Sequence, residues 1–581
     1  MINYKHLNHL PKHLLDYVID QNYDQYSYID HAVWRYVMRQ NIDFLPKVTH
    51  SSYISGLQKT GITVDSIPNM YGMNRILKDI GWAAVAVDGF IPPSAFMEFQ
   101  AHKVLVIAED IRSVEHIGYT PAPDIIHESA GHAPIIADEE YSDYLRLFGE
   151  IGSKAFSSLL DYEIYEAVRF LSIIKEDSKT SIDKIKEAEN KIDILTKKNT
   201  IFSEMTKIRN LHWWTVEYGL IGDLNNPKIY GAGLLSSIEE SKYCLSNNVK
   251  KLPYSILAAN KSFDITEPQP QLFVTPDFKY LNDVLMEFSK DMAFKKGGVY
   301  GLSKACDYKG ISTCVLDSGL QISGNFVNFI SKNNDVVFIK TEGETAISYK
   351  NKEIIGQGVN YHSHGYSCPI GLIDGFDKIL SLCSDLELEE RGVLMDNFCD
   401  LNFTKGISLK GKVINIIKDD LGNILIIQFS DCLVKYKDQV LFEPSWGIFD
   451  LSIGSKIVSI YPGFADQNSF KREKYEPKHK THKKVYDSKT KKLDKMYRDI
   501  RVMRDLKTLS IKEIDNINDI FYILKNDYKN EWLLVLELLE LCINFNLNKT
   551  LILDVQKYLI KLKGNIKSHE KFIDDGLKLL K

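Results

Sequence analysis

Two histidines, His127 and His132, lie five residues apart in the segment PDIIHESAGHAP, which covers residues 123–134. Imidazole nitrogens bind transition metals, so the pair is a candidate metal site. The segment resembles the HExxH pattern of zinc hydrolases but has one residue more between its histidines. On a regular α-helix, residues four apart differ by about 40° around the axis, and residues five apart by about 140°. The spacing therefore disfavours a zinc hydrolase, and both side chains reach one metal only if the helix widens or ends between them.

A carboxylate that could complete such a site is Glu217, in the segment LHWWTVEYGL of residues 211–220. Its neighbours are aromatic or apolar, which predicts a largely apolar environment. A carboxylate buried there costs several kcal/mol unless it is paired or bound to a metal. Two interpretations stay open from these residues alone: a metal ligand, or a salt-bridged and partly exposed glutamate.

Two further segments have residues that suit ligand binding. Arg112 follows the apolar run 104–108, a predicted buried strand, and its planar guanidinium is suited to a carboxylate. A surface arginine is the alternative. The predicted strand 82–87 ends in DGFIPP, whose glycine and prolines make a rigid loop that a flat ligand can approach. A simple strand-to-helix connection would explain this loop equally well.

Length and composition limit the class of protein. The chain of 581 residues is too long for one core and suggests about three to four domains. A net charge of -5 argues against a nucleic-acid-binding protein. No uninterrupted apolar run reaches the about 18 residues that a membrane-spanning helix needs. Eight scattered cysteines without a CxxC pair, and no signal peptide, predict a soluble cytoplasmic protein with reduced thiols.

The patterns along the chain change twice. Residues 1–80 and 138–205 are predicted to be mainly helical, and the charged stretch Lys175–Lys198 a packed or protruding helix. Residues 311–375 and 405–462 alternate as strands do, which suggests a small barrel or sandwich.

Within the first strand region, His362, His364 and Cys368 could bind a metal, but a surface loop is the favoured interpretation.

Residues 471–495 carry 11 Lys or Arg against four acids and are predicted to be a solvated linker or frayed helix. Residues 510–581 are predicted to form helices that could regulate, oligomerise or recruit a protein partner.

Four segments in order resemble one family: PDIIHESAGHAP, WWTVEYGL, YGAGLLSS and TEPQP. Together they are similar to the tetrahydropterin-dependent aromatic amino acid hydroxylases, most of all to the bacterial phenylalanine hydroxylases, over roughly residues 25–300. The expected fold class is multidomain. A mostly α catalytic domain of the hydroxylase type covers 1–310, with a helical insertion at about 160–205. A β-rich region over 311–465 and a basic linker with a helical domain over 466–581 follow.

The resemblance implies that ferrous iron is held by His127, His132 and Glu217. Two imidazoles and one carboxylate on one face of the metal leave positions open for dioxygen and water. Tetrahydropterin is the implied co-substrate, and the implied reaction is ring hydroxylation of an aromatic amino acid, most of all L-phenylalanine to L-tyrosine. A tyrosine or tryptophan hydroxylase, and a non-catalytic relative acting as a scaffold, remain alternatives.

The resemblance also implies roles for the residues around the metal. It places the amino acid contacts at Arg112, Thr120, Trp213, Tyr218, Gly233 and Ser236. It places the pterin contacts at Gly89, Ile91, Phe96 and Glu128. It further implies that Asp124 and Ser236 support the histidine ligands from behind.

Some positions depart from the pattern of the animal members. Between the histidines the chain has Ser129-Ala130 instead of a bulkier apolar pair, Ala122 replaces an acid, and His212 replaces a tyrosine. The insertion also lengthens the chain between His132 and Glu217. None of these changes removes a ligand, but they leave the preferred ring and the affinity for pterin open.

Overall fold

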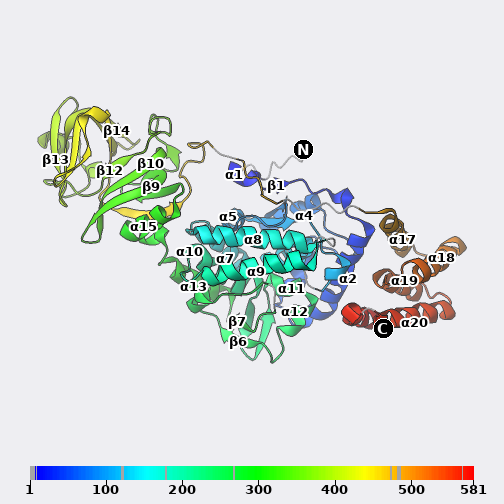
Figure 1. Cartoon of the computed structure of the whole chain (residues 1–581). Helices are drawn as coiled ribbons and strands as arrows, with labels where there is room; N and C mark the ends of the chain where they lie inside the picture. The colour runs from blue at the N-terminus through cyan, green and yellow to red at the C-terminus, as the bar shows by residue number, and fades with distance from the viewer. Residues whose placement is uncertain are drawn as a thin grey trace.

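The computed structural model consists of three parts in a row (Figure 1). It describes residues 7, 10–118, 123–176, 180–265, 268–471, 474–479, 486–565 and 567–580. The central part covers residues 7–308, the β-rich part residues 312–462, and the C-terminal helical part residues 488–580. The β-rich part and the C-terminal helical part lie on opposite sides of the central part, so the chain passes the central part again between them (Figure 1).

The central part is mainly helical and has two small sheets. Its helices are α1 (Lys12–Leu15), α2 (Tyr28–Phe44), α3 (Ser52–Lys59), α4 (Met70–Leu77), α5 (Pro93–Ala101), α6 (Ala133–Ile136), α7 (Glu139–Gly152), α8 (Leu159–Glu176), α9 (Ile182–Lys198), α10 (Glu204–His212), α11 (Ala232–Leu235), α12 (Ile238–Tyr243), α13 (Phe278–Ser289), α14 (Ala293–Lys296) and α15 (Gly298–Tyr308). Its strands are β1 (Val18–Ile19), β2 (Ala83–Val87), β3 (Val104–Ala108), β4 (Leu220–Asp223), β5 (Asn226–Ile229), β6 (Lys250–Pro253) and β7 (Gln271–Thr275).

The two strands expected from the apolar runs 82–87 and 104–108 are β2 and β3, which pair in parallel from Ala83–Val104 to Val87–Ala108. All of β3 is buried, which explains why its sequence is a continuous apolar run and not an alternation. Helix α5 connects these strands, and the loop before it and the segment after β3 reach the functional site. The second sheet has the order β5-β4-β7-β6.

The β-rich part contains two antiparallel sheets that share one hydrophobic core. Its strands are β8 (Ser312–Leu316), β9 (Leu320–Lys332), β10 (Asp335–Tyr349), β11 (Lys352–Glu353), β12 (Ser367–Pro369), β13 (Phe398–Asn402), β14 (Ile407–Lys418), β15 (Ile424–Tyr436), β16 (Gln439–Phe442), β17 (Phe449–Ser452) and β18 (Ile457–Pro462), with one helix, α16 (Asp385–Glu390).

The prediction of a surface loop around His362, His364 and Cys368 is wrong for His362 and Cys368. His362 is 7% exposed and Cys368 is fully buried. His362 Nε2 lies 2.8 Å from Gln357 Oε1, and the Gln357 amide donates to Asp450. A buried polar group must be hydrogen-bonded, and this network fulfils that need without a metal. His364 is exposed, and these three residues are not among the metal-ligand clusters found in the described part of the chain.

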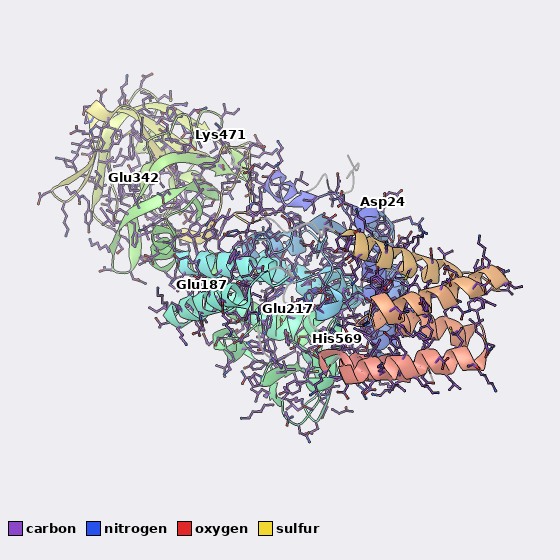
Figure 2. All side chains as sticks on the ribbon, turned by 45° about the vertical axis from the view of Figure 1, so that its right-hand side comes forward. Asp24, Glu187, Glu217, Glu342, Lys471 and His569 are labelled. Atoms are coloured by element: carbon purple, nitrogen blue, oxygen red, sulfur yellow. The ribbon has the colours of Figure 1, made fainter. Side chains whose placement is uncertain are left out.

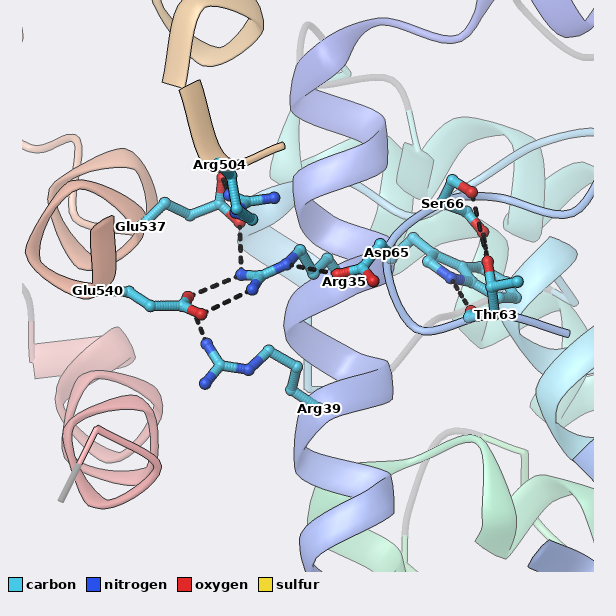
Figure 3. Close-up of polar contacts among 9 residues, drawn as sticks. Arg35, Arg39, Thr63, Asp65, Ser66, Arg504, Glu537 and Glu540 are labelled. Carbon is cyan, nitrogen blue, oxygen red and sulfur yellow. Dashed lines mark hydrogen bonds and ion pairs between the residues drawn. The ribbon is translucent and has the colours of Figure 1, made fainter. Parts of the chain in front are cut away.

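The C-terminal helical part contains α17 (Ser488–Arg504), α18 (Ile511–Asp527), α19 (Leu533–Asn544), α20 (Lys549–Asn565) and α21 (Glu570–Lys578). Its apolar side chains belong to the same core cluster as those of the central part, so the two parts pack tightly. A buried polar contact joins α2 to α19 within this interface (Figure 3). Among the described residues, none of the helices combines the length and apolar character needed to span a bilayer.

For residues 471–495 the sequence predicts a solvated linker or a frayed helix, and the described residues include both an extended segment and a helix. From Ser488 onward the chain is already the regular helix α17. Before it, residues 474–479 lie along the central part, where the Tyr475 ring contacts Tyr17 with 4.4 Å between the ring centroids. The segment is therefore in part a packed strap, although most of its side chains remain exposed.

Candidate functional site

The segment with the two histidines is a π-helix over His127–His132, followed directly by α6. A π-turn closes after five residues and not four, so it brings side chains five positions apart onto one face. The structure thus shows the widening that the spacing required. Gly131 allows close packing at this point, because a Cβ there would lie 2.6 Å from the Ala232 carbonyl oxygen of α11.

Glu217 ends a second π-helix, Trp213–Glu217, which continues α10. Its carboxylate lies against both histidines, with Oε2 at 3.2 Å from His127 Nε2 and Oε1 at 3.3 Å from His132 Nε2. The two Nε2 atoms are 3.2 Å apart. The structure therefore brings together the three side chains that the sequence analysis gave as metal ligands. Glu217 lies in the middle of the central part (Figure 2).

This geometry fits a metal ion. Two ligand atoms at about 2.1 Å from a metal and at right angles to each other lie about 3 Å apart. Burial alone would raise the pKa of Glu217, but His132 and His127 hold it well below its ordinary value. An ionised carboxylate facing two imidazole nitrogens is a donor set suited to a divalent cation.

A second carboxylate, that of Glu128, lies near the same point. It is buried, and its Oε2 is 3.7 Å from His132 Nε2 without a hydrogen-bond partner in the described part of the chain. Burial raises the pKa of Glu128 to about 8, with Glu217 adding to the effect and His132 opposing it. Two carboxyl groups thus lie close to the histidine pair, and their pKa values are shifted in opposite directions, so that Glu217 is the ionised one.

The histidine His127 is oriented by its neighbours. Its Nδ1 lies 3.0 Å from Ser236 Oγ, and its backbone N–H donates to Asp124 Oδ1 at 2.9 Å. Asp124 also accepts two bonds from the Arg112 guanidinium, at 2.7 and 2.8 Å, and Arg112 donates to the Ser236 carbonyl at 3.1 Å. Asp124 and Ser236 therefore connect a metal-site histidine to Arg112, which fixes the position of both.

Arg112 is only 1% exposed, so the alternative of a surface arginine is wrong. Its partner Asp124 is also buried; burial alone would raise the pKa of Asp124, but Arg112 holds it below its ordinary value. The charge of the arginine is thereby compensated, and its side chain lines the cavity described next.

A cavity of about 250 Å³ opens in front of the histidines. Eleven of the residues given roles in substrate, pterin or metal binding line it: Gly89, Ile91, Phe96, Arg112, His127, Glu128, Trp213, Glu217, Tyr218, Gly233 and Ser236. His132 and Asp124 are buried behind the wall and do not line it. Thr120 and Ala122 lie outside the described residues.

One wall of the cavity is aromatic. The Trp213 ring stacks on Phe263, with 4.2 Å between the centroids and 7° between the planes, and on Tyr218 at 4.5 Å and 24°. The Tyr218 hydroxyl donates to Glu240 at 2.7 Å. Burial raises the pKa of Glu240 to about 7. Flat, stacked rings of this kind offer a surface for another aromatic ring.

Several cavity residues were not expected from the sequence. Tyr165 and Val168 come from α8, in the helical insertion, and Glu240 comes from α12. The helical spacing of Tyr165 and Val168 indicates a common face, but nothing in the sequence indicates what that face contacts. His212 also lies nearby, with Nδ1 at 3.8 Å from Glu217 Oε1, and burial lowers its pKa to about 4.

Comparison with known proteins gives a match for the central part. The model of the family "Biopterin-dependent aromatic amino acid hydroxylase" matches residues 4–158 and 195–300. The phenylalanine-4-hydroxylase of Chromobacterium violaceum is 28% identical over 271 residues, which are 46% of this chain and 76% of that protein. That of Pseudomonas aeruginosa is 26% identical over 270 residues, 46% of this chain and 86% of that protein.

Among solved structures, the Chromobacterium violaceum enzyme with iron(III) and 7,8-dihydrobiopterin is similar, with 27% identity. The match covers 47% of this chain and 85% of that one, with a TM-score of 0.38. The family match leaves out residues 159–194 and everything beyond residue 300.

Proposed function

Because the central part of this chain belongs to the biopterin-dependent aromatic amino acid hydroxylases, we propose that the protein hydroxylates the ring of L-phenylalanine to give L-tyrosine. The chain is thus a pterin-dependent aromatic amino acid monooxygenase. The finer choice of phenylalanine is supported by relatives named phenylalanine-4-hydroxylase at 26–28% identity. The observation that carries the proposal is the approach of His127, His132 and Glu217 to within 3.2–3.3 Å of one another.

These three side chains would hold iron(II), and the cavity wall with Gly89, Ile91, Phe96 and Glu128 would bind tetrahydropterin. The iron and the pterin, when bound, supply the activation of dioxygen, which protein side chains cannot perform. A carboxylate and two imidazoles on one side of the metal leave the cavity side open. The carboxyl group of Glu128, protonated at neutral pH because burial raises its pKa, would offer an O–H donor in the same cavity as the proposed pterin contacts.

The remaining residues bind and orient the amino acid. The guanidinium of Arg112 has five N–H groups, of which Asp124 and Ser236 receive three bonds. This anchoring holds the guanidinium flat and is compatible with binding the substrate carboxylate. The stacked rings of Trp213 and Phe263 would then guide the substrate ring towards the metal and exclude water from it.

The test is turnover by the purified full-length protein with iron(II), a tetrahydropterin and air. Phenylalanine, tyrosine and tryptophan are supplied separately and then in competition, and products are separated by chromatography. We expect tyrosine from phenylalanine, with the highest kcat/KM for that substrate. Faster turnover of tyrosine or tryptophan would refute the choice of ring, and no turnover of any of the three would refute the enzyme and favour a scaffold.

A matched pair of variants makes this test specific to the site. His127→Ala should abolish turnover because it removes a metal ligand. His364→Ala removes an exposed histidine of the β-rich part and should leave kcat unchanged. Equal activity of the two variants would show that the activity does not depend on the proposed centre.

A further inference from the structure

Arg169 lies on α8, in the stretch 159–194 that the family match leaves out. Its side chain is buried, with 2% exposed, and its hydrogen bonds go to main-chain oxygens of two distant segments. Nη1 donates to the carbonyls of Asp88, at 2.8 Å, and of Phe90. Nε and Nη2 donate to the carbonyl of His479, at 3.2 and 2.9 Å. One guanidinium thus joins the insertion, the loop after β2 and the strap that leads to the C-terminal helices.

The loop held by Arg169 is the one expected to contact the pterin. The two carbonyls that it binds flank Gly89, whose φ of +61° lies in the left-handed region. Glycine adopts this region without steric cost and has several other conformations open to it, so contacts of the neighbouring residues must select one. Bonds on both sides of the glycine do so here. Gly89, Phe90 and Ile91 all line the cavity, so the conformation of the loop sets the shape of that wall.

A second bond strengthens the same contact. The Tyr165 hydroxyl, one turn before Arg169, donates to the Phe90 carbonyl at 3.2 Å. The hydroxyl of Tyr475, in the strap, lies 3.0 Å from the Tyr165 hydroxyl and can donate to it in turn. Tyr165 also lines the cavity itself. The insertion therefore supports the loop from behind and also provides part of the cavity wall.

The choice of arginine has a physical reason. A buried cation costs free energy unless it is paired and hydrogen-bonded. Arg169 is both, because Nη2 lies 3.5 Å from Asp88 Oδ2 and the guanidinium donates to three main-chain carbonyls. A planar guanidinium has donors that point in several fixed directions and can satisfy three carbonyls at once. The ammonium group of lysine is a single point and cannot reach all three.

We propose that Arg169 is a positioning residue for the pterin. Arg169 holds the loop Asp88–Ile91 in its binding conformation, and the strap 474–479 in turn holds Arg169. This proposal rests on the proposed function, since the pterin is its ligand. It assigns a role to a segment outside the family match. It also gives a role to the contact between residues 474–479 and the central part.

The experiment uses the full-length protein and does not depend on turnover. Binding of 7,8-dihydrobiopterin to the iron-loaded protein is measured by calorimetry for the wild type, Arg169→Met, Arg169→Lys and Tyr165→Phe. Lys175→Met is the matched control, because Lys175 is on the same helix and pairs with Glu189 of α9, away from the loop. Hydrogen exchange of the peptide containing residues 87–92 is followed in the same samples.

We expect Arg169→Met and Arg169→Lys to weaken pterin binding by about tenfold or more, which corresponds to about 1.4 kcal/mol. Exchange in residues 87–92 should become faster in both, while Lys175→Met behaves as the wild type. Tyr165→Phe, which keeps the ring and loses one bond, should show the same effects to a smaller extent. It also decides the question if the Arg169 variants do not fold.

Pterin affinity and loop exchange within twofold of the wild type in folded Arg169 or Tyr165 variants would overturn the proposal. Failure of the proposed function is distinguishable from this result. In that case the wild type itself would bind no pterin, whereas faster exchange of residues 87–92 in the variants would still show that Arg169 holds the loop.

Discussion

Arg35 and Glu540 form a two-bond ion pair, at 2.8 and 2.7 Å, although 505 residues separate them in the chain. Arg35 is on α2 of the central part and Glu540 on α19 of the C-terminal helical part, and both side chains are 8% exposed (Figure 3). Burial alone would raise the pKa of Glu540, but Arg35 holds it below its ordinary value. The pair is therefore ionised inside the interface between the two parts.

Removing one partner of this pair should destabilise the protein strongly. Arg35→Met removes a partner from two buried carboxylates. It leaves Glu540 with Arg39 and Glu537 with Arg504, and a loss of about 3–5 kcal/mol is expected. Glu540→Gln in the same protein should recover part of the loss, because the buried charge is then gone. Denaturant unfolding followed by fluorescence measures both.

A surface pair provides the control for that cycle. Arg498 and Asp499, at 3.0 Å, are partly exposed, so Arg498→Met should cost less than about 1 kcal/mol. Equal costs for Arg35→Met and Arg498→Met would contradict the assignment of Arg35 and Glu540 as a buried ion pair that stabilises the interface.

The third metal ligand can be identified by comparing the two carboxyl groups near the histidines. Glu217→Gln and His132→Ala should each abolish iron retention, since each removes one of three ligands. Glu128→Gln should retain iron, because the Glu128 carboxyl group that it replaces is already protonated near neutral pH. Iron content is measured by mass spectrometry after gel filtration. Wild-type iron in Glu217→Gln, or loss of iron only in Glu128→Gln, would assign the ligand to Glu128 instead.

Stability should rise with pH across the range in which His31 titrates. Burial, helped by Arg501 and opposed by Asp30, lowers the pKa of His31 to about 4. Its Nδ1 accepts a bond from the Ile67 N–H at 3.2 Å, which requires an unprotonated nitrogen. The unfolded chain, with a pKa of about 6.5, binds the proton more readily. The free energy of unfolding should therefore fall as pH decreases from about 6.5 to 4, by up to about 3 kcal/mol.

This pH effect is assigned to His31 by substitution. His31→Asn cannot titrate and should reduce the difference in unfolding free energy between pH 7 and pH 5. His364→Asn, at an exposed position, should leave that difference unchanged. An unaltered difference in His31→Asn would refute the assignment.

Gly118 and Phe572 should behave as a coupled pair. A Cβ on Gly118 would lie 2.3 Å from Phe572 Cζ of α21, so Gly118→Ala should destabilise the protein by about 1–3 kcal/mol. With Phe572→Ala already present, the same change should cost much less, which a double-mutant cycle measures. Gly72→Ala is the control and should be neutral or slightly stabilising. Among the described residues beyond its own helix turn, none has an atom within 4 Å of the Cβ that the change would add. Additive costs would show that the two residues do not share this contact.

The sequence by itself determined the elements whose chemistry is local. The apolar runs gave β2 and β3 within one residue, because a buried strand needs uninterrupted apolar side chains. The spacing of His127 and His132 required a widened helix turn, and the π-helix is there. The motifs also indicated the family whose model matches residues 4–158 and 195–300.

Only the tertiary structure decided which distant side chains meet. Glu217 had two interpretations from its neighbours, and its position at 3.2 Å from His127 depends on how α10 packs against the histidine segment. Tyr165 and Arg169 gave no local signal. Their partners are main-chain carbonyl oxygens, which every residue has, so no residue type in the sequence marks the contact. The same holds for Arg35 and Glu540, since a contact between residues far apart in sequence depends on the packing of whole helices and is not encoded in the local pattern.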